Sequence, residues 1–119
     1  MVAKAEQIRS LLSGKACDLV ESAIPSSECS TDSYRVVFTV NRREIDEYIA
    51  KNGFPEGVVR SRAGTRDGVY MIRSMFGYSV YYQERGIVMD KQFFISRTAA
   101  VKRVTDYRIG LSGTGLKFE

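Results

Sequence analysis

The residues best suited to chemistry lie in a basic segment that contains glycine, RSRAGTRDG, at residues 60–68. Its three arginines, Arg60, Arg62 and Arg66, carry planar guanidinium groups that bind phosphate or carboxylate oxygens in pairs. Backbone amides of such a loop can hold the same anion. The segment is not a P-loop, because the spacing GxxxxGK[ST] is absent. Its commonest role would be a solvated loop, and the functional alternative is recognition of a protein or a nucleic acid.

A second group of titratable side chains is the carboxylate cluster Glu44, Asp46 and Glu47. On a helix, Glu44 and Glu47 share one side and Arg43 lies four residues before Glu47, so local ion pairs on a solvated face explain the cluster. A general acid–base pair would need a pocket and a raised pKa, for which the sequence gives no sign. An enzyme whose site combines Arg60, Arg62 and tyrosines with Glu44 or Glu47 is the least supported hypothesis. We expect no catalytic residue.

Composition excludes further chemistries. The chain of 119 residues contains no His, which removes a His base, a His metal ligand and a Ser-His-Asp triad. Two cysteines, Cys17 and Cys29, cannot build a four-thiolate zinc site, and neither belongs to a CxxC pair. We therefore expect no metal and no cofactor.

The expected compartment is the cytoplasm. No apolar run approaches the roughly 20 residues that span a bilayer, and the start, MVAKAEQIRS, lacks the apolar core of a signal peptide. Cytoplasmic disulfides are rare, so Cys17 and Cys29 are predicted to be reduced thiols with a structural or incidental role. We expect no membrane partner.

Charge is distributed unevenly along the chain. Residues 1–32 carry three basic and five acidic side chains, a net of −2, and residues 33–119 carry 15 basic and nine acidic ones, a net of +6. A positive region attracts nucleic acid or an acidic protein partner. Acidic residues are mixed among the basic ones, whereas a dedicated phosphate binder would more often show a denser stripe of Lys and Arg.

Hydrophobic periodicity predicts the first elements. Residues 2–24 show helical spacing that is interrupted at Gly14, where either one helix continues or a first helix ends and a second begins near Lys15. Residues 25–33 are small and polar and are expected to form a loop. Residues 34–40 alternate as Tyr-Arg-Val-Val-Phe-Thr-Val, which predicts a half-buried strand.

The rest of the chain predicts a helix, several strands and a last helix. Residues 41–52 form the helix, with Asn41 as N-cap, Glu44 completing a capping box and Gly53 as a left-handed stop. The elements expected after it are a short strand at 58–62, strands at 69–75, 78–83 and 91–95, and a helix from Ser96 to Gly110. This order indicates an α+β fold, with a mainly antiparallel sheet of about four strands and three helices packed on it. We expect a single domain over residues 1–119.

The strand at 78–83 concentrates tyrosines. Tyr78, Val80 and Tyr82 share one face and are predicted to lie in the core, so Tyr81 points the other way. An exposed Tyr81 could stack on a nucleic-acid base or anchor a protein interface.

A resemblance appears over residues 78–104, YSVYYQERGIVMDKQFFISRTAAVKRV. This stretch resembles the strand–turn–strand–helix module of small immunity proteins from bacterial polymorphic toxin and contact-dependent inhibition systems. The matching positions are Val80-Tyr81-Tyr82, Glu84-Arg85-Gly86, Phe93-Phe94, Ser96 and Ala100. The chain departs from that pattern because it has no Trp and because its last helix is basic. The resemblance implies a non-catalytic inhibitor that binds a cognate toxin domain.

We expect the partner-binding surface on the irregular segment that contains Arg60, Arg62, Arg66 and Asp67, because loops held by a sheet commonly carry recognition. Three side chains of the preceding helix would extend this surface: Arg42, Arg43 and Glu47. The next surface to test would be the hairpin tip at residues 81–90, with Tyr81, Glu84 and Arg85. The alternative is a small basic module that binds nucleic acid or regulates, whose nucleic-acid affinity would fall steeply with salt.

Overall fold

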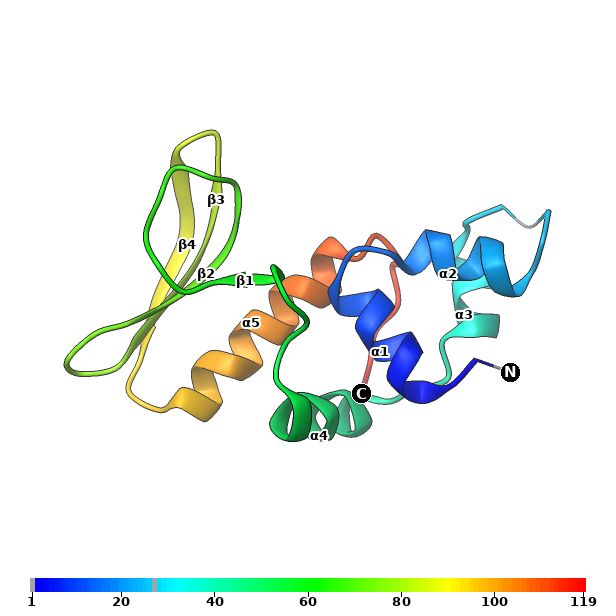
Figure 1. Ribbon diagram of the computed structural model, residues 1–119, viewed down its shortest axis with the longest axis horizontal. Coiled ribbons are helices and arrows are strands. Elements are labelled where there is room, and N and C mark those ends of the chain that lie inside the picture. The colour runs from blue at the N-terminus through cyan, green and yellow to red at the C-terminus, as the bar shows by residue number, and fades with distance from the viewer. Residues whose placement is uncertain (1, 27) are drawn as a thin grey trace. The chain divides into compact units, whose positions relative to one another are not determined.

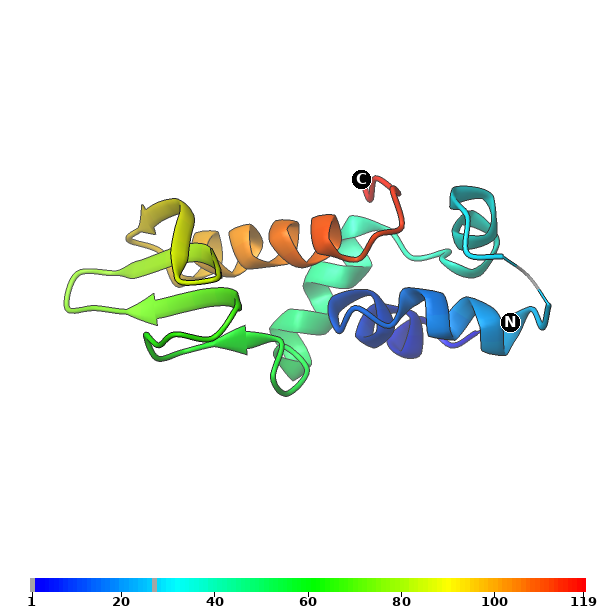
Figure 2. The ribbon, with the colours of Figure 1, turned by 90° about the horizontal axis from the view of Figure 1, so that it is seen from above.

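The computed structural model describes residues 2–26 and 28–119 (Figures 1 and 2). This part of the chain contains five helices and a four-stranded sheet, which confirms the α+β class and corrects the expected number of three helices. The chain divides into two compact units. The helical unit consists of the residues up to Pro55 together with 109–119, and the sheet unit consists of residues 56–108. No helix among the described residues is both long and apolar enough to cross a membrane.

The stretch predicted to be helical at the start of the chain forms two helices, α1 (Lys4–Leu12) and α2 (Ala16–Ala23). Gly14 lies between them with φ of 73°, a left-handed conformation that glycine adopts without the steric cost of a side chain. The second of the two alternatives is therefore correct. The loop predicted to follow includes position 27, which lies outside the described residues.

Residues 34–40, predicted to form a strand, belong mainly to helix α3 (Thr31–Val37), so that prediction is wrong. Ser30 caps the helix, because its side-chain oxygen accepts a hydrogen bond from the backbone N–H of Ser33. The buried side chains are Tyr34, Val37 and Phe38, at helical spacing. Val36, which the alternating pattern placed inside, is 68% exposed.

Helix α4 (Arg42–Asn52) begins and ends as predicted. Asn41 accepts from the backbone N–H of Glu44, and the Glu44 carboxylate accepts from the backbone N–H of Asn41, which completes the capping box. Gly53 ends the helix with φ of 76°. The Lys4 ammonium and the Asn41 N–H hold the pKa of Glu44 below its usual value.

The core of the helical unit contains a buried amide among its aliphatic side chains, of which Leu11, Leu12 and Ile45 are fully buried. The Gln7 side-chain oxygen accepts from the backbone N–H groups of Thr39, at 2.8 Å, and Val40, at 3.3 Å. These bonds satisfy buried polar groups that would otherwise destabilise the folded state.

The sheet unit contains β1 (Val59–Arg60), β2 (Gly68–Arg73), β3 (Tyr78–Glu84) and β4 (Ile87–Phe94), arranged in that spatial order. β2, β3 and β4 are antiparallel neighbours, but β1 runs parallel to β2. The sheet is therefore mixed, which corrects in part the prediction of a mainly antiparallel sheet. Between β3 and β4, Arg85 and Gly86 have φ of 50° and 79°, as a tight hairpin turn requires.

Helix α5 (Arg97–Leu111) lies against one face of this sheet. Ser96 accepts a hydrogen bond from the backbone N–H of Ala99, as expected for the N-terminus of the helix. The rings of Tyr82 and Tyr107 stack at 6.3 Å, and Ala100 and Val104 are fully buried. Burial and the nearby Asp90 carboxylate raise the pKa of Tyr107. The opposite face of the sheet is covered by the loop between β1 and β2.

Candidate functional site

The loop between β1 and β2, residues 61–67, arches over the sheet (Figure 1). We call residues 60–67 the arginine loop. Parallel neighbours usually need a longer crossover, but this pairing covers two residues of each strand, so the return path is short. Arg60 Nε donates to the carbonyl oxygen of Asp67 at 3.0 Å, and the Asp67 carboxylate accepts from the backbone N–H of Arg85 at 2.8 Å. These bonds fix the two ends of the loop and tie it to the hairpin.

Two side chains of the sheet hold the loop from below. Tyr70 donates its hydroxyl hydrogen to the carbonyl oxygen of Arg66 at 2.6 Å, and Gln83 donates its amide hydrogen to that of Gly64 at 2.7 Å. Tyr70 and Gln83 are 1% and 5% exposed, so water cannot replace the loop carbonyls as acceptors for these two donors. The loop conformation is therefore a property of the folded unit and not of the loop alone.

The arginine loop borders an open hollow of about 530 Å³. Its lining consists of Gly57, Val59, Arg60, Ser61, Arg62, Gly64, Thr65, Arg66 and Tyr70. Among the described residues, no carboxylate lies within 4.0 Å of the guanidinium groups of Arg60, Arg62 or Arg66. Asp67, the nearest acidic residue in sequence, is engaged with the Arg85 N–H. The hollow can therefore bind an anion without first breaking an ion pair.

The structure brings together the three arginines predicted to bind a partner, because Arg60, Arg62 and Arg66 line the same hollow. Arg62 and Arg66 are exposed, whereas Arg60 is half-buried against Gly68. Asp67 and the backbone of Arg85 support the loop.

Tyr81, predicted to point outward, is buried, so it cannot serve as an exposed anchor. Its side chain is 6% exposed and stacks on Tyr70 with ring centroids 4.9 Å apart. Burial first, and then the neighbouring Tyr70, raises the pKa of Tyr81. The prediction failed because the arginine loop covers the second face of the sheet, which the alternation of a single strand does not reveal.

Arg43 and Glu47, predicted to extend the surface, belong to the helical unit and pair with each other at 2.9 Å. Arg42 and Asp46 on the same helix also pair at 2.9 Å. Pairs four residues apart on an exposed helix stabilise it weakly. These contacts match the local ion pairs expected for the carboxylate cluster.

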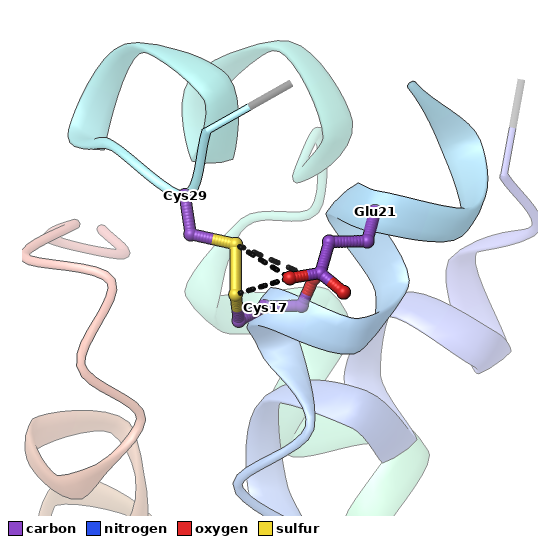
Figure 3. A group of neighbouring side chains, drawn as sticks. All are labelled: Cys17, Glu21 and Cys29. Atoms are coloured by element: carbon purple, nitrogen blue, oxygen red, sulfur yellow. Dashed lines mark hydrogen bonds between the residues drawn. A yellow bond between two sulfur atoms is a disulfide. The ribbon is translucent and has the colours of Figure 1, made fainter. Parts of the chain in front are cut away.

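The two cysteines form a disulfide, which corrects the prediction of reduced thiols. Cys17 lies on α2 and Cys29 precedes α3, so the bond links α2 to the segment before α3 (Figure 3). The positions of two cysteines in a sequence do not decide between thiols and a disulfide, because the oxidation state depends on the redox compartment. A link of this kind stabilises mainly by restricting the unfolded chain.

The Glu21 carboxylate points at the disulfide (Figure 3). Its Oε1 lies 3.5 Å from Cys17 Sγ and 4.0 Å from Cys29 Sγ. Disulfide sulfurs carry no hydrogen, so these contacts become hydrogen bonds only when the cysteines are thiols. The two sulfurs and the Glu21 oxygen lie within 4.8 Å of one another, a spacing that could suit metal ligands. Because the sulfurs are joined in a disulfide, they are not thiolates and do not bind a metal as thiolates do.

A second hollow, of about 400 Å³, lies in the helical unit between the end of α3 and the C-terminal segment. Its lining consists of Arg35, Phe38, Val40, Gly115, Leu116, Lys117 and Phe118. Arg35 lies 3.7 Å from the Asp32 carboxylate, so one of its two cations already has an acidic neighbour. Two cationic side chains line this hollow, whereas three line the one beside the arginine loop.

Sequence reasoning identified the arginines but missed Tyr70 and Gln83, which hold the loop. The available signal was a polar Gln inside a strand with three tyrosines, because a buried amide requires hydrogen-bond partners. No protein-family model, curated protein or solved structure matches this chain.

Proposed function

We propose that this protein is a non-catalytic immunity protein that binds and neutralises a cognate bacterial toxin domain through the arginine loop. The observation that carries the proposal is a set of three arginines without acidic partners among the described residues, held on a loop anchored to a sheet. Rigidly held loops commonly carry recognition, and Arg is enriched among the residues that dominate binding energy. The resemblance of residues 78–104 supports the same class.

The toxin surface that fits this loop is acidic. Residues 56–108 carry ten basic and five acidic side chains, a net of +5, so the sheet unit would attract a negative partner from a distance. Neutralisation would be stoichiometric, with the immunity protein covering the active site or an essential surface of the toxin. We place this action in the cytoplasm, where a disulfide is unusual.

Co-expression tests the proposal. Cells that produce a toxin domain encoded beside this gene should resume growth when this protein is produced at an equal level. Continued killing with folded protein present would contradict neutralisation. The variant Arg62→Glu/Arg66→Glu should lose the rescue, whereas Arg73→Glu, a charge reversal at the opposite end of β2, should retain it.

The net charge of the sheet unit also favours a second candidate function, binding to nucleic acid. A titration of generic DNA and RNA at two salt concentrations separates the two functions. Binding that falls steeply with salt and needs no protein partner would favour the nucleic-acid module.

A further inference from the structure

We propose that the hollow beside the arginine loop is a binding site for a phosphate monoester, a ligand whose terminal phosphate enters between Arg60, Arg62 and Arg66. This inference goes beyond toxin neutralisation, because it needs no partner protein. It rests on the charge, donor count and rigidity of the hollow.

The charge of the hollow favours a multiply charged anion. Arg60, Arg62 and Arg66 all line it, and no carboxylate among the described residues lies within 4.0 Å of their guanidinium groups. A phosphate monoester carries about −1.5 to −2 at neutral pH, whereas a single carboxylate carries one negative charge. The monoester therefore offsets more of the repulsion among three neighbouring cations.

The number of donors leads to the same ligand. Each guanidinium presents N–H groups in a planar fork, and one of them, Nε of Arg60, is used by the Asp67 carbonyl. A terminal phosphate offers three acceptor oxygens, so each of Arg60, Arg62 and Arg66 can bind a different edge. A carboxylate offers two oxygens, and a phosphodiester has two unesterified ones. Three arginines around one anion fit the monoester best.

The remaining walls of the hollow limit what else is recognised. Tyr70 is 1% exposed and covered by Tyr81, so it offers no ring face on which a base could stack. Ser61 and Thr65 add hydroxyl groups that can donate to phosphate oxygens. A hollow of about 530 Å³ is larger than one phosphate, which leaves room for the group to which the phosphate is attached. Specificity is therefore directed at the phosphate.

The loop needs little reorganisation to bind. Arg66 and Gly64 are fixed through their carbonyl oxygens by Tyr70 and Gln83, and Asp67 is fixed by the Arg85 N–H. Ordering a free loop would oppose binding, and these bonds have already ordered this one. The side chains of Arg62 and Arg66 remain exposed and accessible to the ligand.

Amide NMR titration of the ¹⁵N-labelled full chain with methyl phosphate tests the site. We expect saturable shifts in the amides of Gly57, Gly64 and Thr65, with a dissociation constant below about 10 mM. Arg62→Ala should weaken binding about tenfold or more, since hydrogen bonds to charged groups are strong. Arg73→Ala, which removes an exposed arginine of the same unit, should leave the affinity within about twofold.

Two further ligands test the chemistry. Dimethyl phosphate, a diester with one charge, and glutarate, a dicarboxylate, should each bind about tenfold or more weakly than methyl phosphate. Arg62→Lys keeps the charge but loses the fork, so its affinity should lie between those of the wild type and Arg62→Ala.

Three results would overturn the proposal: no saturation by methyl phosphate, equal loss in the Arg62 and Arg73 variants, or glutarate binding as tightly as methyl phosphate. The titration contains no toxin, so its failure is distinguishable from failure of the co-expression rescue.

Discussion

In the helical unit, Lys4, Arg35, Arg42 and Arg43 each lie within 4.0 Å of a carboxylate. In the sheet unit, no carboxylate among the described residues lies that close to the guanidinium groups of the three arginines of the arginine loop. The helical unit carries eight basic and nine acidic side chains, a net of −1, and the sheet unit carries a net of +5. On helix α4, Arg43 pairs with Glu47. The same residue type therefore supports a helix in one unit and is left available to a ligand in the other.

The two units also differ in how their irregular segments are held. The segment between α2 and α3 is closed by the Cys17–Cys29 disulfide, and the arginine loop is held by hydrogen bonds from Tyr70 and Gln83. A covalent link restricts the unfolded chain, whereas buried donors select one folded conformation. We infer that the disulfide contributes to stability and the hydrogen bonds to recognition.

The largest expected effect concerns the core of the helical unit. Leu12→Ala removes a side chain that is 0% exposed and should lower the free energy of unfolding by about 2–5 kcal/mol. Val36→Ala is the control, because Val36 is 68% exposed on α3 and should change stability by less than about 0.5 kcal/mol. Urea denaturation measures both. A large loss of stability from Val36→Ala would contradict helix α3 and favour a strand over residues 34–40.

The next effect concerns the disulfide. Replacing Cys17 and Cys29 together with Ala should cost about 2–4 kcal/mol of stability, the usual range for such a link. Partner binding and methyl phosphate binding should be unchanged, because both are assigned to the sheet unit. Thermal melts and titrations of the double variant measure this, and thiol alkylation of protein taken from cells reports whether the bond forms there. Loss of binding by a folded variant would contradict the division of roles.

A smaller effect is expected from the loop anchor. Tyr70→Phe removes the hydroxyl that donates to Arg66 and should cost about 1 kcal/mol of stability. Methyl phosphate binding should also weaken, although every arginine remains, because the loop is less well held. Urea melts beside the NMR titration check this prediction. Unchanged affinity would show that the arginines bind without the anchor.

The smallest effect is the pH dependence of the Glu44 ion pair. Its pKa is lowered from 4.5 in the folded protein, so the charged form contributes stability that is present above about pH 4.5 and is lost as pH falls through the lower folded value. The stability difference between the wild type and Glu44→Gln should therefore shrink on acidification. Urea midpoints measured across this range test the sign. A difference that grows at low pH would contradict it.

Local signals in the sequence predicted local structure correctly. Asn41 and Glu44 are three residues apart and form the capping box by contacts within one turn. Arg85 and Gly86 mark the hairpin turn for the same reason. Ser96 marks the start of the last helix through its own side chain. None of these features depends on distant parts of the chain.

Features set by distant contacts could not be predicted. Residues 34–40 fit a strand by alternation, but Tyr34, Val37 and Phe38 also fit a helix, and packing decides between the two. Tyr81 is buried because a loop from another part of the sheet unit covers it. The arginines could be identified as candidates, but their shared hollow depends on Tyr70 and Gln83 below them.

The central claim is that the arginine loop is the recognition surface, and calorimetric titration of the toxin domain tests it most directly. Arg62→Glu/Arg66→Glu should weaken binding by about 2 kcal/mol or more, roughly 30-fold, with an unchanged thermal melt. Arg73→Glu, a charge reversal in the same unit, should stay within about threefold of the wild type. Equal affinities for the wild type and the double variant, or equal losses in both variants, would contradict the claim.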